Sequence, residues 1–101
     1  MTHHQVLTFH VFRMPKQSGY KMDDMLVVNV VWDDSYYLAT CADATISNAY
    51  GTGKTIGKAI KDLLLAIAKY YELDAKYARK GKLGARLLAQ HEALGMIISK
   101  R

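Results

Sequence analysis

The chain has 101 residues, of which 50% are hydrophobic and 23% are charged, and its formal net charge at pH 7 is +5. This balance is typical of one globular domain and excludes a disordered chain. A chain of this size can bury one core, and we expect no enclosed active-site cavity beside it. Its longest apolar run, Leu63–Ala68, falls far short of the ~18 residues that a membrane span needs. No signal-like segment opens the sequence, and we therefore expect a cytoplasmic protein.

The charge is distributed unevenly along the chain. Residues 1–50 carry three basic and five acidic side chains, whereas residues 51–101 carry eleven basic and four acidic ones. A basic half suggests an acidic partner, and nucleic acid is the commonest acidic partner of proteins.

The first half of the sequence predicts an antiparallel sheet. Apolar and β-branched residues favour a strand over residues 6–12, and the polar residues 16–21 are expected to form a loop. Residues 25–32 form the strongest predicted strand. Asp33-Asp34 offers a tight turn into a second β-rich run at residues 35–41, so the two runs predict a hairpin. A short third strand is expected near residues 48–51.

A long helix is expected after this sheet. Thr55 is the predicted N-cap, and the helix is expected to continue to about Tyr71 or beyond. Its apolar residues recur at helical spacing, while its lysines fall mostly on the other side. A second helix is predicted over residues 83–94, with Gly95 ending it and a terminal strand at residues 96–98.

Together these elements predict an α+β fold in a single domain, residues 1–101. An antiparallel sheet of three to four strands and one long helix packed on it are expected within residues 6–75. Residues 76–101 are expected to form a basic C-terminal extension, either helical or strand.

The segment Gly51-Thr52-Gly53-Lys54-Thr55 is similar to the end of a phosphate-binding loop. The full pattern needs a further glycine where this chain has Asn48, and it must follow a buried parallel strand. We therefore assign the segment a local role, in which the glycines turn the chain out of a strand and Thr55 caps the helix.

No catalytic or metal-binding set is expected, and no cofactor is implied. The single cysteine, Cys41, excludes clusters of thiolate ligands and is predicted to be a buried apolar residue. His10 and His91 are each expected to lie alone, and His3-His4 near one end of the chain. The paired acids Asp23-Asp24 and Asp33-Asp34 are expected in loops and turns rather than in one pocket, and so the protein is predicted not to be an enzyme.

One basic run and three tyrosines are the candidate binding residues. The basic run could follow a phosphate backbone, although it could equally be a solvated helix end; its members are Lys76, Arg79, Lys80, Lys82 and Arg86. Nucleic-acid bases could stack on the tyrosines if these lie exposed on the sheet, although sheet tyrosines more often complete a core; they are Tyr36, Tyr37 and Tyr50.

Residues 26–72 resemble the HicB-like antitoxin family. The resemblance rests on the hairpin LVVNVVWDDSYYLATCAD, the link ATISNAYGTGKT and the helix TIGKAIKDLLLAIAKYYE. Asp43 matches the aspartate of the family's link, Gly53 and Thr55 match its helix start, and Ala59-Ile60 match a small-apolar pair. Ala42 departs from the pattern, because the family usually has proline there. Gly57 and Lys58 likewise replace the usual acidic residues.

This resemblance implies a degenerate RNase H-like fold that has lost its catalytic carboxylates. It also implies a non-catalytic antitoxin of a toxin–antitoxin system, which masks a small toxin protein and acts as a homo-oligomer. The alternative is a stand-alone RNA- or DNA-binding protein that uses the basic second half of the chain.

Overall fold

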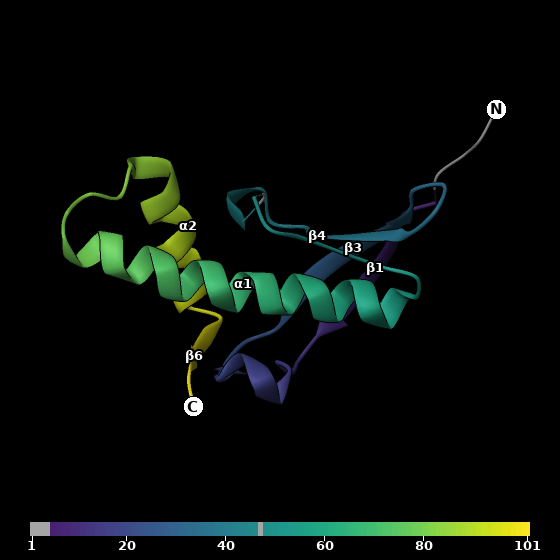
Figure 1. The fold of residues 1–101 in the computed structure, drawn as a ribbon, viewed down its shortest axis with the longest axis horizontal. Helices are drawn as coiled ribbons and strands as arrows, with labels where there is room; N and C mark the ends of the chain where they lie inside the picture. Colours follow the sequence, from purple (N-terminus) through teal and green to yellow (C-terminus); the bar gives the residue numbers. More distant parts are fainter. Residues whose placement is uncertain (1–4, 47) are drawn as a thin grey trace.

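The computed structural model describes residues 5–46 and 48–101, and it has the predicted α+β architecture (Figure 1). Four strands form an antiparallel sheet in the order β1-β3-β4-β5. Their bounds are Leu7–Val11, Leu26–Trp32, Tyr37–Cys41 and Tyr50–Gly53. The long helix α1, Ile56–Arg79, crosses one face of this sheet, and its C-terminal turns extend past the sheet to α2, Ala85–Gly95.

The predicted hairpin is confirmed as β3–β4. Trp32 pairs with Tyr37, and Val28 pairs with Cys41 at the other end of the ladder. Asp34 lies in the turn with a φ of 60°, a left-handed conformation that aspartate tolerates better than most residues. The alternation of strand β3 places Leu26, Val28 and Val30 in the core, as expected from the sequence.

Strand β5 differs from the predicted third strand in position and in the role of its glycines. It runs over Tyr50–Gly53, so both glycines of the Gly51-Thr52-Gly53 segment lie within the strand and not in a turn leading out of it. A Cβ atom added to Gly51 would overlap the backbone of Leu63 and Ala59. The segment thus lets β5 lie directly against the helix backbone, which no larger residue would allow.

Helix α1 begins as predicted and is longer than the minimum predicted. The Thr55 side chain accepts a hydrogen bond from the Lys58 amide at 3.2 Å, which confirms Thr55 as the N-cap. The helix continues to Arg79 and packs on the sheet with its apolar side. Its fully buried residues in the core include Ala59, Leu63 and Ile67.

Residues 16–21 were expected to form a loop, and this expectation was wrong at Tyr20 and Lys21, which begin a strand. A 3-10 turn at Lys16–Ser18 precedes this short strand, β2, at Tyr20–Met22. Strand β2 pairs antiparallel with the terminal strand β6, Ile98–Lys100, which also lies two residues later than predicted. In Figure 1 these segments lie below α1, and β1 and β3 pass behind the helix toward them. The long-range pairing had no local signal in the sequence.

Helix α2 packs against α1 and against a second 3-10 turn, Ala44–Ile46. One core therefore joins both parts of the chain, because Leu94 and Ile98 belong to the same buried cluster as Val28 and Leu63. Within the described residues, neither helix is long and apolar enough to cross a membrane.

Candidate nucleic-acid interface

A row of basic side chains follows the outward face of α1. We define the basic row as Lys58, Lys61, Lys69, Lys76 and Arg79, all of which are exposed. Their spacings of three, eight, seven and three residues bring them to one side of a helix that has 3.6 residues per turn. At 1.5 Å per residue the row is about 32 Å long. It points away from the sheet, because the opposite side of α1 carries the buried residues.

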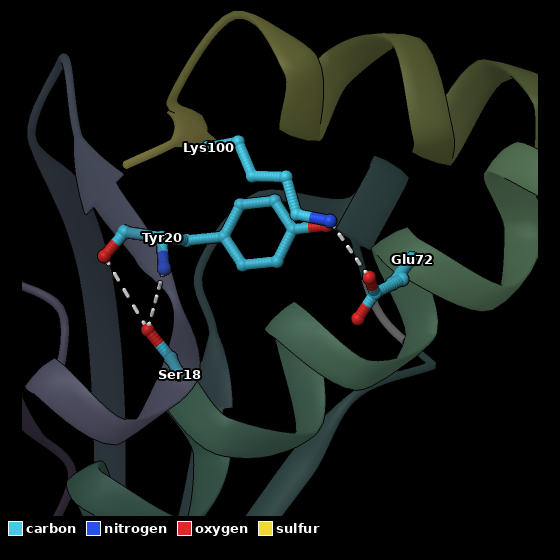
Figure 2. Close-up of polar contacts among 4 residues, drawn as sticks. All are labelled: Ser18, Tyr20, Glu72 and Lys100. Atoms are coloured by element: carbon cyan, nitrogen blue, oxygen red, sulfur yellow. Dashed lines mark hydrogen bonds and ion pairs between the residues drawn. The ribbon is translucent and has the colours of Figure 1, made fainter.

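Glu72 is an acidic side chain that interrupts this row, and a lysine pairs with it. Lys100 of β6 donates a hydrogen bond to the Glu72 Oε1 atom at 2.9 Å, as Figure 2 shows. This hydrogen bond and the charge of Lys100 lower the pKa of Glu72, and the same contact raises the pKa of Lys100. Lys100 therefore offsets the negative charge of Glu72, whereas the exposed Asp62, near Lys58 and Lys61, accepts a hydrogen bond from the Thr52 amide at 2.9 Å.

A groove lies beside the C-terminal half of the row, between α1 and β6. Its volume is about 360 Å³, and Lys76, Arg79 and Lys100 contribute to its lining. Tyr20 and Tyr71 form its apolar side, with ring centroids 5.7 Å apart in an edge-to-face arrangement. Burial, followed by the charge of Glu72, raises the pKa of Tyr20. Lys76 and Arg79 lie beside the Glu72–Lys100 pair and form no ion pair of their own among the described residues, so the groove favours an anionic group such as a phosphate.

The five basic residues predicted from the sequence all lie at one end of the molecule. Lys76 and Arg79 belong to the last turns of α1, and Lys80 and Lys82 lie in the turn that follows the helix. Arg86 lies in the first turn of α2 and donates a hydrogen bond to Asn48 at 3.3 Å. The left-handed Gly81, with a φ of 65°, reverses the chain between the two helices. The sequence run therefore becomes a basic tip that continues the row.

The three candidate tyrosines do not form one surface. Tyr50 lies 59% exposed on the sheet face away from α1, opposite Thr40. Tyr36 precedes β4, and its hydrogen bond with Asp33 together with the charge of that carboxylate raises its pKa. Tyr37 is on the helix side of the sheet and contacts the Trp32 ring edge-to-face at 4.9 Å. The sheet lies between the basic row and Tyr50, and Tyr37 packs against the core that α1 covers with its opposite side.

Sequence reasoning overlooked part of this surface. The sequence placed Lys58, Lys61 and Lys69 on the polar side of the helix. It was not recognised that they share one side of the helix with Lys76 and Arg79. The near seven-residue spacing of Lys61, Lys69 and Lys76 was the available signal. Lys100 and Tyr20 could not have been found, because the β2–β6 pairing brings them to the helix.

The acidic residues and histidines lie apart from this surface. Asp33 and Asp34 occupy the exposed hairpin turn, and Asp43 accepts a hydrogen bond from the Thr45 amide at 2.8 Å. His91 stacks on Tyr71 with a centroid distance of 4.4 Å, and His10 is exposed on β1. His3-His4 lies outside the described residues. Among the described residues, no three His, Cys, Asp or Glu side chains are grouped to hold a metal ion.

Comparison with protein-family models, with curated proteins and with solved structures found no match to this chain. The fold and the charged surfaces described above are therefore the basis for the functional argument.

Proposed function

We propose that this protein binds a nucleic-acid duplex along the basic row and the basic tip, and that it does so without catalysing a reaction. The observation that carries this proposal is the continuous alignment of five exposed cations over about 32 Å of a single helix face. This length is close to the 34–36 Å of one helical turn of B-form DNA. Cations spaced along such a distance can contact phosphates on both sides of a groove.

The absence of aromatic side chains from this row favours a duplex over a single strand. Proteins that hold single strands combine cations with aromatic rings on which the bases stack. Here Tyr50 lies on the sheet face away from α1 and Tyr20 is buried, while the exposed Tyr70 and Tyr77 of α1 are turned about 100° around the helix from the row. Contacts made by lysine and arginine alone address the phosphate backbone and carry little sequence information.

The salt dependence of binding tests this proposal. Eight phosphate contacts, five from the row and three from the tip, predict that the logarithm of the affinity for duplex DNA falls with the logarithm of the salt concentration at a slope of about −7. Fluorescence anisotropy with a labelled duplex of about 20 base pairs, two helical turns long, measures this slope. Parallel titrations with single-stranded DNA, single-stranded RNA and duplex RNA show which nucleic acid is preferred.

Charge-neutralising variants localise the interface. Replacing Lys61, Lys69 and Lys76 with Gln should reduce the slope to about −4.5, because five of the eight contacts remain. The matched control replaces Lys16, Lys21 and Lys54, which are exposed and lie outside the row, so it changes the net charge equally. Equal losses in the two triple variants, or no duplex binding at low salt, would contradict the proposal. Replacing Lys80, Lys82 and Arg86 tests the basic tip in the same way.

A second candidate function is that of an antitoxin-like protein that masks a protein partner. Two observations favour it. The order β3-β4-β5-α1 is the one that the resemblance to HicB-like antitoxins implies, and the sheet face away from α1 carries no lysine, arginine or carboxylate. That open sheet face consists of Thr8, His10, Val27, Asn29, Val31, Leu38, Thr40, Tyr50 and Thr52.

Growth assays separate this second function from the first. If the protein is an antitoxin, a small protein encoded beside its gene should arrest growth, and co-expression of this chain should relieve the arrest. Replacing Val31 and Leu38 of the open sheet face with Lys should abolish the relief, whereas the triple variant of the basic row should retain it. No relief by the unmodified chain would argue against the antitoxin function. Analytical ultracentrifugation of the same variants tests whether a homo-oligomer forms through this face.

A further inference from the structure

A small pocket between the two helices is distinct from the basic surface. We define the α1–α2 pocket by its lining residues, which are Asn48, Tyr70, Asp74, Leu87 and Gln90. Its volume is about 270 Å³, slightly below the range of about 300–1,000 Å³ found for sites that hold drug-sized ligands. The C-terminal half of α1 and the first turns of α2 form its walls. A ligand that fits it has only a few non-hydrogen atoms.

Gln90 carries an unused hydrogen-bond acceptor at this pocket. Its side chain is 3% exposed, and no donor in the described part of the chain reaches its buried Oε1 atom. A buried acceptor without a partner costs about 1–3 kcal/mol of stability. Such atoms are rare in folded proteins and need an explanation. A ligand that donates a hydrogen bond to the Oε1 atom is one such explanation.

Asp74 is the second polar group of the pocket. It is 9% exposed on the buried side of α1, and within the described residues no hydrogen bond or ion pair engages its carboxylate. Burial raises the pKa of Asp74, and the nearby His91 partly opposes this shift. A buried carboxylate is stabilised by an opposite charge that carries hydrogen-bond donors.

The remaining lining residues suit a cation with a short apolar chain. Tyr70 can place its ring face toward a positive charge, and Leu87 supplies apolar surface. Asn48 is held at the pocket by its hydrogen bond from Arg86, which occupies its Oδ1 atom. An anion is disfavoured beside Asp74. Ca²⁺ and Mg²⁺ take six or more oxygen ligands, of which this pocket supplies one carboxylate and the side-chain amide oxygens of Asn48 and Gln90.

From these contacts we infer that the α1–α2 pocket binds a primary ammonium group on a short alkyl chain. The ammonium donates to the Asp74 carboxylate and, when the Gln90 side chain turns its buried amide into the pocket, to the Gln90 Oε1 atom. The alkyl chain packs against Leu87 and Tyr70. Such a group belongs either to a free small amine or to the side chain of a lysine. This inference does not depend on the proposed binding of nucleic acid.

NMR titration with n-butylamine tests the inference. At constant ionic strength, the amine should produce saturable shifts in the resonances of Tyr70, Leu87 and Gln90, whereas n-butanol at the same concentration should not. Shifts of equal size with n-butanol would overturn the inference, and so would shifts spread over all carboxylates of the protein. Nα-acetyl-lysine methylamide, titrated in parallel, tests the lysine side chain; stronger binding than n-butylamine assigns the pocket to a lysine of a partner, and weaker binding assigns it to a free amine.

Two variants and one control complete the test. Asp74→Asn removes the charge at nearly constant volume and should weaken n-butylamine binding at least tenfold, and Gln90→Leu should weaken it by removing the acceptor. Glu92→Gln removes an exposed carboxylate two residues from Gln90 and should leave the affinity unchanged. Unchanged affinity in both pocket variants would overturn the assignment of the site. Affinity for the duplex is measured separately, so failure here leaves the proposed function standing.

Discussion

At the scale of single residues, Gly51 decides how closely the sheet approaches the helix. Its position against the backbone of Ala59 and Leu63 leaves no space for a Cβ atom. We expect Gly51→Ala to lower the free energy of unfolding by about 1–3 kcal/mol or more, because either the strand or the helix must move. Urea denaturation measures this loss.

The matched control is Gly57, at the start of α1. A Cβ atom added there meets no atom within 4 Å, and the φ angle is in the ordinary range. Gly57→Ala should therefore leave the stability unchanged or raise it by up to about 1 kcal/mol. Equal destabilisation by the two substitutions would contradict the close contact between β5 and α1.

Cys41 is a second residue whose surroundings determine its behaviour. It is buried in strand β4, as predicted, and its burial together with the charge of Asp43 raises the pKa of its thiol to about 12. Since the thiolate is the reactive form, we expect almost no reaction with Ellman's reagent in the folded protein at pH 8. Full reaction should appear on unfolding in urea. Rapid labelling of the native protein would show that the thiol is accessible.

At the scale of the element, the stability of α1 depends on its N-cap residue as well as on its buried side. Thr55 satisfies the amide of Lys58, one of the backbone donors that a helix leaves free at its start. We expect Thr55→Ala to lower the free energy of unfolding by about 1 kcal/mol, whereas Thr55→Asp should be nearly neutral. Thermal melts followed by circular dichroism measure both variants. An equal loss in Thr55→Asp would argue that packing of the threonine methyl group, rather than capping, is what matters.

At the scale of the whole molecule, the C-terminal residues complete the core that the first strands begin. Ile98 is 1% exposed and lies in β6, which pairs with β2. Ile98→Ala should cost about 2–5 kcal/mol, because it leaves a cavity in a shared core. Met96, which is 79% exposed, is the control, and Met96→Ala should change the stability by less than about 0.5 kcal/mol.

The same variant tests whether the chain unfolds as a single unit. Trp32 lies at the hairpin end of the sheet, so its fluorescence reports on a region outside β2 and β6. If residues 76–101 belong to one cooperative domain, Trp32 fluorescence and circular dichroism should follow the same transition in Ile98→Ala. Two separate transitions would instead assign the C-terminal segment to an independent unit.

The candidate site was predicted in part, and the missing part has a geometric cause. Lys76 and Arg79 were predicted as candidate binding residues because they lie in a dense local run. The importance of Lys58 and Lys61 depends on a helix that continues without a break to Arg79, and only the full length of α1 aligns them. The sequence interpretation also grouped three tyrosines that the sheet divides between its two faces.

The sequence by itself determined the elements whose signals are local. A two-residue period predicted β3, the acidic pair predicted its hairpin turn, and a threonine before a helical pattern predicted the start of α1; these follow from backbone geometry over a few residues. Only the tertiary structure decided the pairing of Tyr20–Met22 with Ile98–Lys100, the contact of Lys100 with Glu72 and the close approach at Gly51. These contacts join residues distant in the chain, and their positions depend on how all the packed surfaces fit together at once.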